Sequence, residues 1–350
     1  MTDERVALFR WLPALAARVP FAALGDWPTP LDRIDVEGKP IWIKREGDAS
    51  ALYGGNKVRT LEAWLGHVRA AGAERIWAIG AYGSNHAIAT VLHARAIGLD
   101  AGVILFPQPA SAWAHENARA LVASGCRLVR LHSVIEVPFV GVAIAMRERK
   151  RAIVMPPGGA TPIGTLGALS AAFELAEQIA TGHAPPPQRI VLPVGSTCTT
   201  AGLLAGFALA RAVGAWRWPV PVVHAVRVTP WPVTSAILIE QLAAATLARI
   251  AKLGGPRVEL AEPRLIVDAG ELGGGYGRIT ARGRDALATL TGPGMPRLDG
   301  VYSAKAAAAL LRLHRRGIAP LVFWSTKSTV QLAAPDPLRA PRALARWLAG

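Results

Sequence analysis

The chain has 350 residues, of which 51% are hydrophobic and 18% charged, and this balance supports a large core and excludes a disordered chain. The formal net charge is +15, but the basic residues are scattered, so they favour a solvated surface over a nucleic-acid site, and no apolar run is long enough to span a bilayer. Two cysteines exclude a disulfide framework, and no signal peptide is recognisable, so we expect a cytoplasmic protein with no nucleic-acid or membrane partner.

Short apolar strands alternate with helices along most of the chain. Residues 1–40 are expected to lead up to the first strand, with a proline-stiffened turn at 27–31. Strands are expected at 41–45, 75–80, 101–106, 127–131, 152–155, 189–194, 221–228, 264–268 and 320–324. Helices are expected at 58–71, 85–97, 113–123, 137–149, 163–180, 200–213, 233–250, 280–290 and 303–316, and again after the last strand. This alternation predicts an α/β fold with parallel sheets flanked by helices.

The first candidate site lies between a predicted strand and a predicted helix, in the run Tyr53-Gly54-Gly55-Asn56-Lys57. Glycines permit a tight turn and a close approach of the backbone to a ligand. A lysine at such a junction is either a surface charge or, with a lowered pKa, a covalent catalyst for carbonyl chemistry. The sites further along the chain favour the second interpretation.

The second candidate site is the run Gly83-Ser84-Asn85-His86, which follows a predicted strand and opens a helix. Backbone N–H groups at a helix start favour anions, and Ser84 is also a good N-cap residue. Spacing alone leaves two interpretations open, because Ser84 and His86 fit a capped, packed turn as well as a ligand site.

A third candidate site follows the strand at 189–194, where small and hydroxyl-bearing residues precede a helix. Exposed amides, hydroxyl donors and a helix N-terminus form a phosphate cradle, although an ordinary capped turn has the same composition. The run lacks the glycine-lysine pair of a nucleotide P-loop, and Cys198 has no identifiable partner for a nucleophile's role. The candidate phosphate ligands are Gly195, Ser196, Thr197, Cys198, Thr199 and Thr200.

A fourth candidate site combines two tyrosines, Tyr276 in the run Gly274-Gly275-Tyr276-Gly277 and Tyr302 in the run Leu298-Asp299-Gly300-Val301-Tyr302-Ser303. A glycine-flanked tyrosine is weak evidence alone. Taken together and in this order, the four sites resemble the pyridoxal-phosphate enzymes related to D-cysteine desulfhydrase and 1-aminocyclopropane-1-carboxylate deaminase. The resemblance extends from about residue 28 to residue 332.

The resemblance implies a fold-type II, tryptophan synthase beta-like architecture of two α/β domains, with pyridoxal 5'-phosphate in the cleft between them. Residues 1–58 and 160–350 would form the larger domain, and residues 59–159 the smaller, inserted one. A homodimer acting on a small amino acid is also implied, and no metal site is expected.

The resemblance also implies roles for individual residues. Lys57 would hold the cofactor as a Schiff base and move the α-proton, Asn85 would bond the ring oxygen, and Ser84 would bind the substrate carboxylate. Tyr276 and Tyr302 would serve as proton shuttle and substrate contact. The expected catalytic residues are thus Lys57, Ser84, Tyr276 and Tyr302, the substrate contacts Ser84, Asn85 and His86, and the cofactor contacts Lys57, Asn56, Asn85, residues 195–200 and Ser303.

Ser303 indicates the reaction. Related deaminases have a glutamate here and desulfhydrases a threonine; because a hydroxyl holds a protonated ring nitrogen less well than a carboxylate, Ser303 favours α,β-elimination over cyclopropane opening. We therefore expect a lyase that converts a D-cysteine-like amino acid to pyruvate and ammonia, with the deaminase as the alternative. A second alternative is a cofactor-binding protein of reduced or no activity, because the chain departs from the family at Gly83, Ile88, Ala304 and Lys327. A lysine at 327 would crowd the site or bind an acidic substrate group.

Overall fold

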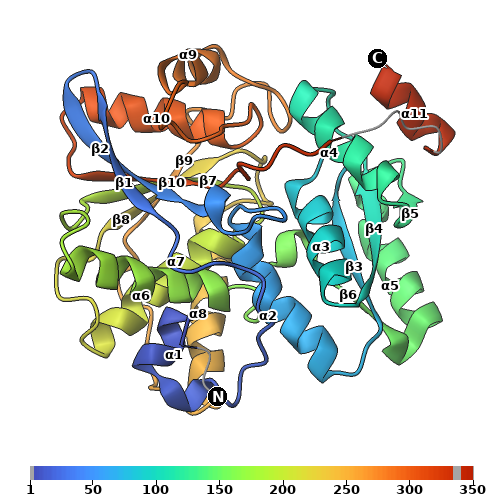
Figure 1. The fold of residues 1–350 in the computed structure, drawn as a ribbon, viewed down its shortest axis with the longest axis horizontal. Coiled ribbons are helices and arrows are strands. Elements are labelled where there is room, and N and C mark those ends of the chain that lie inside the picture. The colour runs from blue at the N-terminus through green and yellow to red at the C-terminus, as the bar shows by residue number, and fades with distance from the viewer. Residues whose placement is uncertain (1–3, 334–339, 350) are drawn as a thin grey trace.

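A computed structural model describes residues 4–333 and 340–349, which form two separate β-sheets with helices on their faces (Figure 1). The larger sheet has six strands in the order β1-β2-β10-β7-β8-β9, and the smaller has four in the order β5-β4-β3-β6. The larger-sheet strands are β1 (Leu31–Val36), β2 (Lys39–Arg45), β10 (Leu321–Ser325), β7 (Arg189–Val194), β8 (Val222–Arg227) and β9 (Leu265–Asp268). The smaller-sheet strands are β5 (Arg127–Arg130), β4 (Asp100–Phe106), β3 (Arg75–Ala81) and β6 (Ala152–Val154). Every pairing is parallel except β1 with β2, which confirms the predicted α/β class.

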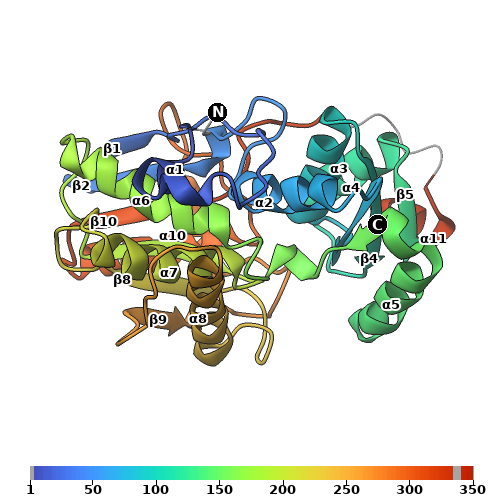
Figure 2. The ribbon, with the colours of Figure 1, turned by 90° about the horizontal axis from the view of Figure 1, so that it is seen from below.

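Helices cover both faces of each sheet. On the larger sheet, α9 (Ala281–Thr289) and α10 (Ser303–Arg315) lie on one face. The other face carries α1 (Ala7–Trp11), α6 (Leu166–Ala180), α7 (Cys198–Ala212) and α8 (Ala236–Lys252). The smaller sheet has α2 (Lys57–Ala70), α3 (Asn85–Ala96), α4 (Ala112–Ala123) and α11 (Arg342–Ala349) on one side and α5 (Val137–Glu148) on the other. The two sheets lie side by side along the long axis of the molecule (Figure 2).

The prediction for the first 40 residues was wrong in two places, where α1 and β1 form. β1 pairs with β2 through a turn at Glu37 and Gly38, both of which have positive φ. Polar residues interrupt the apolar pattern of Leu31–Val36, and only Leu31 and Val36 within it are fully buried. Pairing with β2, a tertiary contact, therefore stabilises a strand that its own pattern does not predict.

A buried ionic cluster joins β2, α2 and α6 beside the start of α2. Arg59 Nε lies 2.7 Å from Glu46 Oε2, and Arg59 Nη2 lies 2.9 Å from Glu174 Oε1, to which Lys44 Nζ also donates. The Arg59 guanidinium also stacks on the Trp27 ring. Burial alone would raise the pKa of Glu174, but Arg59 and Lys44 outweigh burial and lower it to about 2. The cluster holds α2 in place through Arg59, which lies two residues after Lys57.

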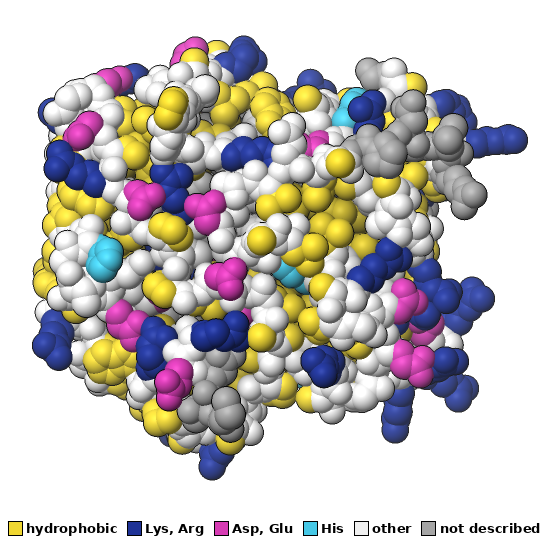
Figure 3. Space-filling view, in the orientation of Figure 1, with side chains coloured by type: hydrophobic (Ala, Val, Ile, Leu, Met, Phe, Trp, Pro, Cys, Tyr) yellow, Lys and Arg dark blue, Asp and Glu magenta, His cyan; other side chains and the backbone are white. Residues whose placement is uncertain are grey.

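The surface agrees with the scattered charge of the sequence. On the face shown in Figure 3, Lys and Arg side chains are spread widely, with Asp and Glu side chains among them. No helix within residues 4–333 and 340–349 combines the length and apolar character that crossing a membrane requires.

Candidate active site

Lys57 is the first residue of α2, and two glycines bring it there. A Cβ on Gly54 would stand 1.9 Å from the Gly47 oxygen, and one on Gly55, whose φ is +103°, would stand 2.8 Å from the Thr326 oxygen. Only glycine therefore lets this turn pack against its neighbouring loops. The Lys57 Nζ then reaches the end of β7, where it donates to Ser196 Oγ at 3.2 Å.

The Lys57 amine is suited to nucleophilic chemistry. Its Nζ donates to the Gly158 oxygen at 3.1 Å, and no carboxylate of the described residues forms an ion pair with it. Burial lowers the pKa of Lys57, since a charged amine is poorly solvated at this position. A larger fraction of the amine is therefore neutral and able to attack a carbonyl carbon.

The predicted phosphate loop forms the start of α7. β7 ends at Val194, Thr197 takes a left-handed conformation with φ of 66°, and α7 begins at Cys198 without a side-chain cap. The first N–H groups of the helix are therefore free of intrahelical partners, as an anion site requires. Asn56 Nδ2 donates to Thr199 Oγ1 at 2.8 Å and joins the Lys57 turn to this loop.

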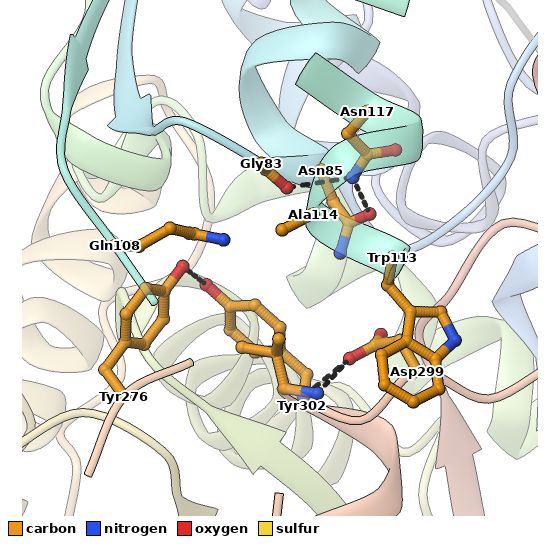
Figure 4. Close-up of a pocket in the computed structure, with 10 residues that line it drawn as sticks. Gly83, Asn85, Gln108, Trp113, Ala114, Asn117, Tyr276, Asp299 and Tyr302 are labelled. Carbon is orange, nitrogen blue, oxygen red and sulfur yellow. Dashed lines mark hydrogen bonds between the residues drawn. The ribbon is translucent and has the colours of Figure 1, made fainter. Parts of the chain in front are cut away.

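Asn85 is the first residue of α3, and its amide is held in one orientation. Its Oδ1 accepts from Asn117 Nδ2 at 2.8 Å, Lys327 Nζ at 2.9 Å and the Tyr53 hydroxyl at 3.0 Å. Because Oδ1 takes these three donors, Nδ2 points into the pocket (Figure 4). The amide can therefore donate to an acceptor on a bound ligand.

The neighbours of Asn85 have different surroundings. Ser84 Oγ accepts the Ala87 N–H at 3.2 Å, so this hydroxyl caps α3. His86 is buried, and neither ring nitrogen has a hydrogen-bond partner among the described residues. Burial and the nearby Lys57 hold the pKa of His86 well below its usual value, so the ring is neutral.

The two predicted tyrosines come together. Their hydroxyls are 2.9 Å apart, and Lys305 Nζ anchors the loop of Tyr276 by donating to the Leu272 and Gly275 oxygens at 2.8 Å each. Burial raises the pKa of Tyr276 to about 12, and burial together with the neighbouring Tyr276 holds the pKa of Tyr302 well above its usual value. Both tyrosines are therefore protonated at neutral pH, and in the bond between them one hydroxyl donates and the other accepts. A Cβ on Gly195 would stand 3.2 Å from Tyr302 Cε1, which places Tyr302 beside the phosphate loop.

Ser303 begins α10 and is fully buried. Its hydroxyl accepts the Asp299 N–H and donates to the Asp299 oxygen at 3.3 Å. The hydroxyl thus belongs to the hydrogen-bonded turn that also carries Tyr302.

Sequence reasoning did not assign several residues of the pocket. Asp299 Oδ1 accepts the N–H groups of Val301 and Tyr302, while Asp299 Oδ2 has no partner among the described residues. Gln108 is another pocket residue that was not assigned. Its position in the sequence was the one available signal, because it follows the carboxyl end of a parallel strand, where α/β sheets form their binding sites. The cavity is about 10 Å³ and is lined by Gly83, Asn85, Gln108, Trp113, Ala114, Asn117, Tyr276, Asp299, Val301 and Tyr302 (Figure 4).

The fold and the site define a pyridoxal-phosphate enzyme. The sequence model of the family described as "Pyridoxal-phosphate dependent enzyme" matches residues 22–320, and the chain therefore belongs to that family. This confirms the resemblance, the fold type and the cofactor inferred from the sequence.

Individual relatives are similar along most of their length. Nocardicin C-9' epimerase of Nocardia uniformis is 33% identical, with 86% of this chain and 90% of that protein aligned. A putative 1-aminocyclopropane-1-carboxylate deaminase of Pyrococcus abyssi is 33% identical over 87% and 89%, and D-cysteine desulfhydrase of Serratia proteamaculans is 28% identical over 88% and 94%. The solved structure of an ACC deaminase homologue superposes with a TM-score of 0.73 at 30% identity and covers 91% of this chain and 94% of that one.

The residues present fit this cofactor. The start of α7 has no side-chain cap and suits the phosphate, Lys57 is an amine with no carboxylate partner among the described residues, and Asn85 Nδ2 points into the pocket. When bound, pyridoxal phosphate supplies an aldehyde for a lysine amine and a ring that withdraws electrons.

Proposed function

We propose that this protein is a lyase that removes the β-substituent of a small, D-cysteine-like amino acid and releases pyruvate and ammonia. The observation that carries the proposal is the hydroxyl of Ser303, buried at the start of α10. A hydroxyl at the ring nitrogen makes the ring a weaker electron sink than a carboxylate does, and elimination needs less electron withdrawal than cyclopropane opening. The D-cysteine desulfhydrase name of the Serratia relative supports the same reaction.

The chain's own residues divide the work. Lys57 would hold the cofactor and then move the α-proton, while the amides and hydroxyls of residues 195–200, with Asn56, would hold the phosphate. Asn85 would bond the ring oxygen, and Ser303 would face the ring nitrogen. Ser84, Asn85 and His86 would bind the substrate carboxylate at the start of α3. Tyr276 and Tyr302, which are protonated, would contact the substrate and donate a proton where one is needed.

The test is a product assay with purified protein beside Lys57→Ala. Pyruvate is measured after incubation with D-cysteine, L-cysteine and β-chloro-D-alanine, and 2-oxobutanoate after incubation with 1-aminocyclopropane-1-carboxylate. Pyruvate from a D-substrate in wild type alone supports the proposal. Production of 2-oxobutanoate instead would establish the deaminase. A visible absorption band with no product and no spectral response to any amino acid would establish a protein of reduced activity.

A second candidate function is inversion at the α-carbon of an amino acid, because the name of the Nocardia relative is that of an epimerase. Inversion needs one group to remove a proton and another to return one on the opposite face. The site holds an amine, Lys57, next to Ser196, and a protonated tyrosine, Tyr302, next to Gly195. Chiral chromatography of the recovered amino acid after incubation in deuterium oxide tests this: inverted, deuterated product without pyruvate would replace elimination.

We also propose the two-domain division at residues 59 and 159 and a cytoplasmic homodimer. The four strands of the smaller sheet all fall between those residues, and both cysteines are free, as a reducing compartment favours. Exposed apolar side chains on α5, among them Phe139 and Met146 at 73% each, offer surface for a second copy. Light scattering after size-exclusion chromatography tests the dimer, and a monomer at micromolar concentration would contradict it.

A further inference from the structure

Lys327 is a buried lysine that the proposed reaction does not use. It lies in the loop after β10, in the run Ser325-Thr326-Lys327-Ser328, and is 2% exposed. The Asn56 N–H approaches the Thr326 oxygen at 3.4 Å, so the loop packs against the turn that carries Lys57. Lys327 Nζ donates to Asn85 Oδ1 at 2.9 Å and lies 3.4 Å from the Tyr53 hydroxyl.

The charged groups around Lys327 do not neutralise it by direct pairing. Within the described residues no carboxylate forms an ion pair with its Nζ. The carboxylates that act on it are Asp299 and Glu116, and Glu116 is paired with Arg297 at 2.6 Å. Burial and, to a smaller extent, the Arg297 guanidinium lower the pKa of Lys327, and the two carboxylates oppose that change. Burial raises the pKa of Tyr53, so this hydroxyl stays neutral and contributes no charge.

The contact with Lys327 changes what Asn85 can do. A cation at Oδ1 polarises the amide, and a polarised amide is a stronger donor at Nδ2. Tyr53 and Asn117 hold the same oxygen, but both are neutral. Lys327 is thus the charged member of the group that bonds Asn85 Oδ1, whereas the Nδ2 of the same amide faces the pocket (Figure 4).

We propose that Lys327 is a positioning residue that places a positive charge at Asn85 Oδ1 and, through the Asn85 amide, stabilises the ionised form of the cofactor's ring oxygen. The proposal rests on the proposed roles of Lys57 and Asn85 and is independent of which reaction follows. A nearby cation stabilises an oxyanion. The same cation opposes protonation of a nitrogen close to that oxyanion, here the Lys57 nitrogen that would be joined to the cofactor. The bound cofactor should therefore lose its proton at a lower pH than it would without Lys327.

The experiment is a spectroscopic pH titration of the visible band of the protein loaded with pyridoxal phosphate, in the absence of substrate. Lys327→Gln keeps a hydrogen-bond donor without the charge, Lys327→Met removes both, and Lys327→Arg keeps the charge. We expect the apparent pKa of the band to rise by about one unit in the glutamine and methionine variants and to stay near the wild-type value in the arginine variant.

The outcomes separate this proposal from the assignment of the site. An unchanged titration in folded Lys327→Gln and Lys327→Met would overturn the proposal, and a glutamine variant that behaves as wild type would reduce Lys327 to a hydrogen-bond donor and also overturn it. Asn85→Ala interrupts the same path while Lys327 stays in place, so the same upward shift is expected there. If Asn85→Ala shows no such shift, the proposed path from Lys327 through the Asn85 amide to the ring oxygen is refuted. This holds even if no neutral Lys327 variant folds. Absence of any visible band in wild type would instead contradict the role of Lys57.

Discussion

Replacing Glu174 with glutamine tests how strongly the buried ionic cluster holds α2 and therefore Lys57. Glu174 bonds Arg59 and Lys44, whose side chains are 4% and 0% exposed. The substitution leaves two buried cations with Glu46 as the remaining carboxylate of the cluster. Removing one member of a buried ion pair costs roughly 3–5 kcal/mol, because the remaining charge is neither solvated nor paired.

The pH dependence gives a second measure of the same interaction. The pKa of Glu174 falls from an ordinary 4.5 to about 2. A difference of about 2.5 units corresponds to roughly 3 kcal/mol at about 1.4 kcal/mol per unit. Because the folded-state pKa is depressed, this stabilisation is fully present above the unfolded-state pKa and is lost as the pH falls from about 4.5 through about 2.

Urea unfolding followed by tryptophan fluorescence measures both effects. At pH 7 we expect Glu174→Gln to lower the free energy of unfolding by about 3 kcal/mol and to remove most of the loss of stability seen in wild type below pH 4.5. Glu177→Gln is the matched control: it lies on the same helix but pairs with Arg10 at the surface, so it should cost less than about 1 kcal/mol. A Glu174→Gln protein within about 1 kcal/mol of wild type at pH 7 would refute the reasoning.

Three further predictions concern the site. Lys57→Ala should abolish the visible band of the bound cofactor and lower turnover at least about a hundredfold, measured by absorbance and product formation, whereas a retained band would exclude Lys57 as the attachment point. Tyr302→Phe should lower kcat by about tenfold or more with little change in KM, because a proton donor is lost and the packing is kept; an unchanged kcat would leave Tyr302 a packing residue. Thr199→Val should weaken pyridoxal-phosphate binding about tenfold in an equilibrium titration of the apoprotein, since a charge-assisted hydrogen bond is lost, and unchanged affinity would remove Thr199 from the phosphate site.

Most of the fold could be predicted from the sequence because strands buried on both faces read as short apolar runs. The strand predicted at 189–194 is β7, Arg189–Val194, without any difference. β1 could not be found in this way, because its pairing with β2 compensates for the polar residues within it. α1 is five residues long, too short for a helical period to be recognised.

The candidate site was only partly predictable, for a different reason. Lys57 and the loop at 195–200 stand in local motifs, and a motif survives in the sequence. The group that orients Asn85 forms no such local motif. Its members Tyr53, Asn117 and Lys327 come from segments 32 to 242 residues away from Asn85. Hydroxyls are also ambiguous in sequence: Ser84 caps its helix, an interaction that the sequence alone could not separate from a substrate contact.

The position of β10 has a consequence for how the chain folds as it leaves the ribosome. β10 lies between β2 and β7, so Val322 pairs with Trp42 on one side and with Ile190 on the other. The β1–β2 hairpin therefore has an open edge throughout the synthesis of almost 280 residues, whereas the smaller sheet is complete once β6 ends at Val154. An unpaired edge of this kind invites wrong pairings with other strands until the last strand inserts. A chain terminated before residue 320 would retain every proposed catalytic residue and still be unable to close the sheet that assembles them.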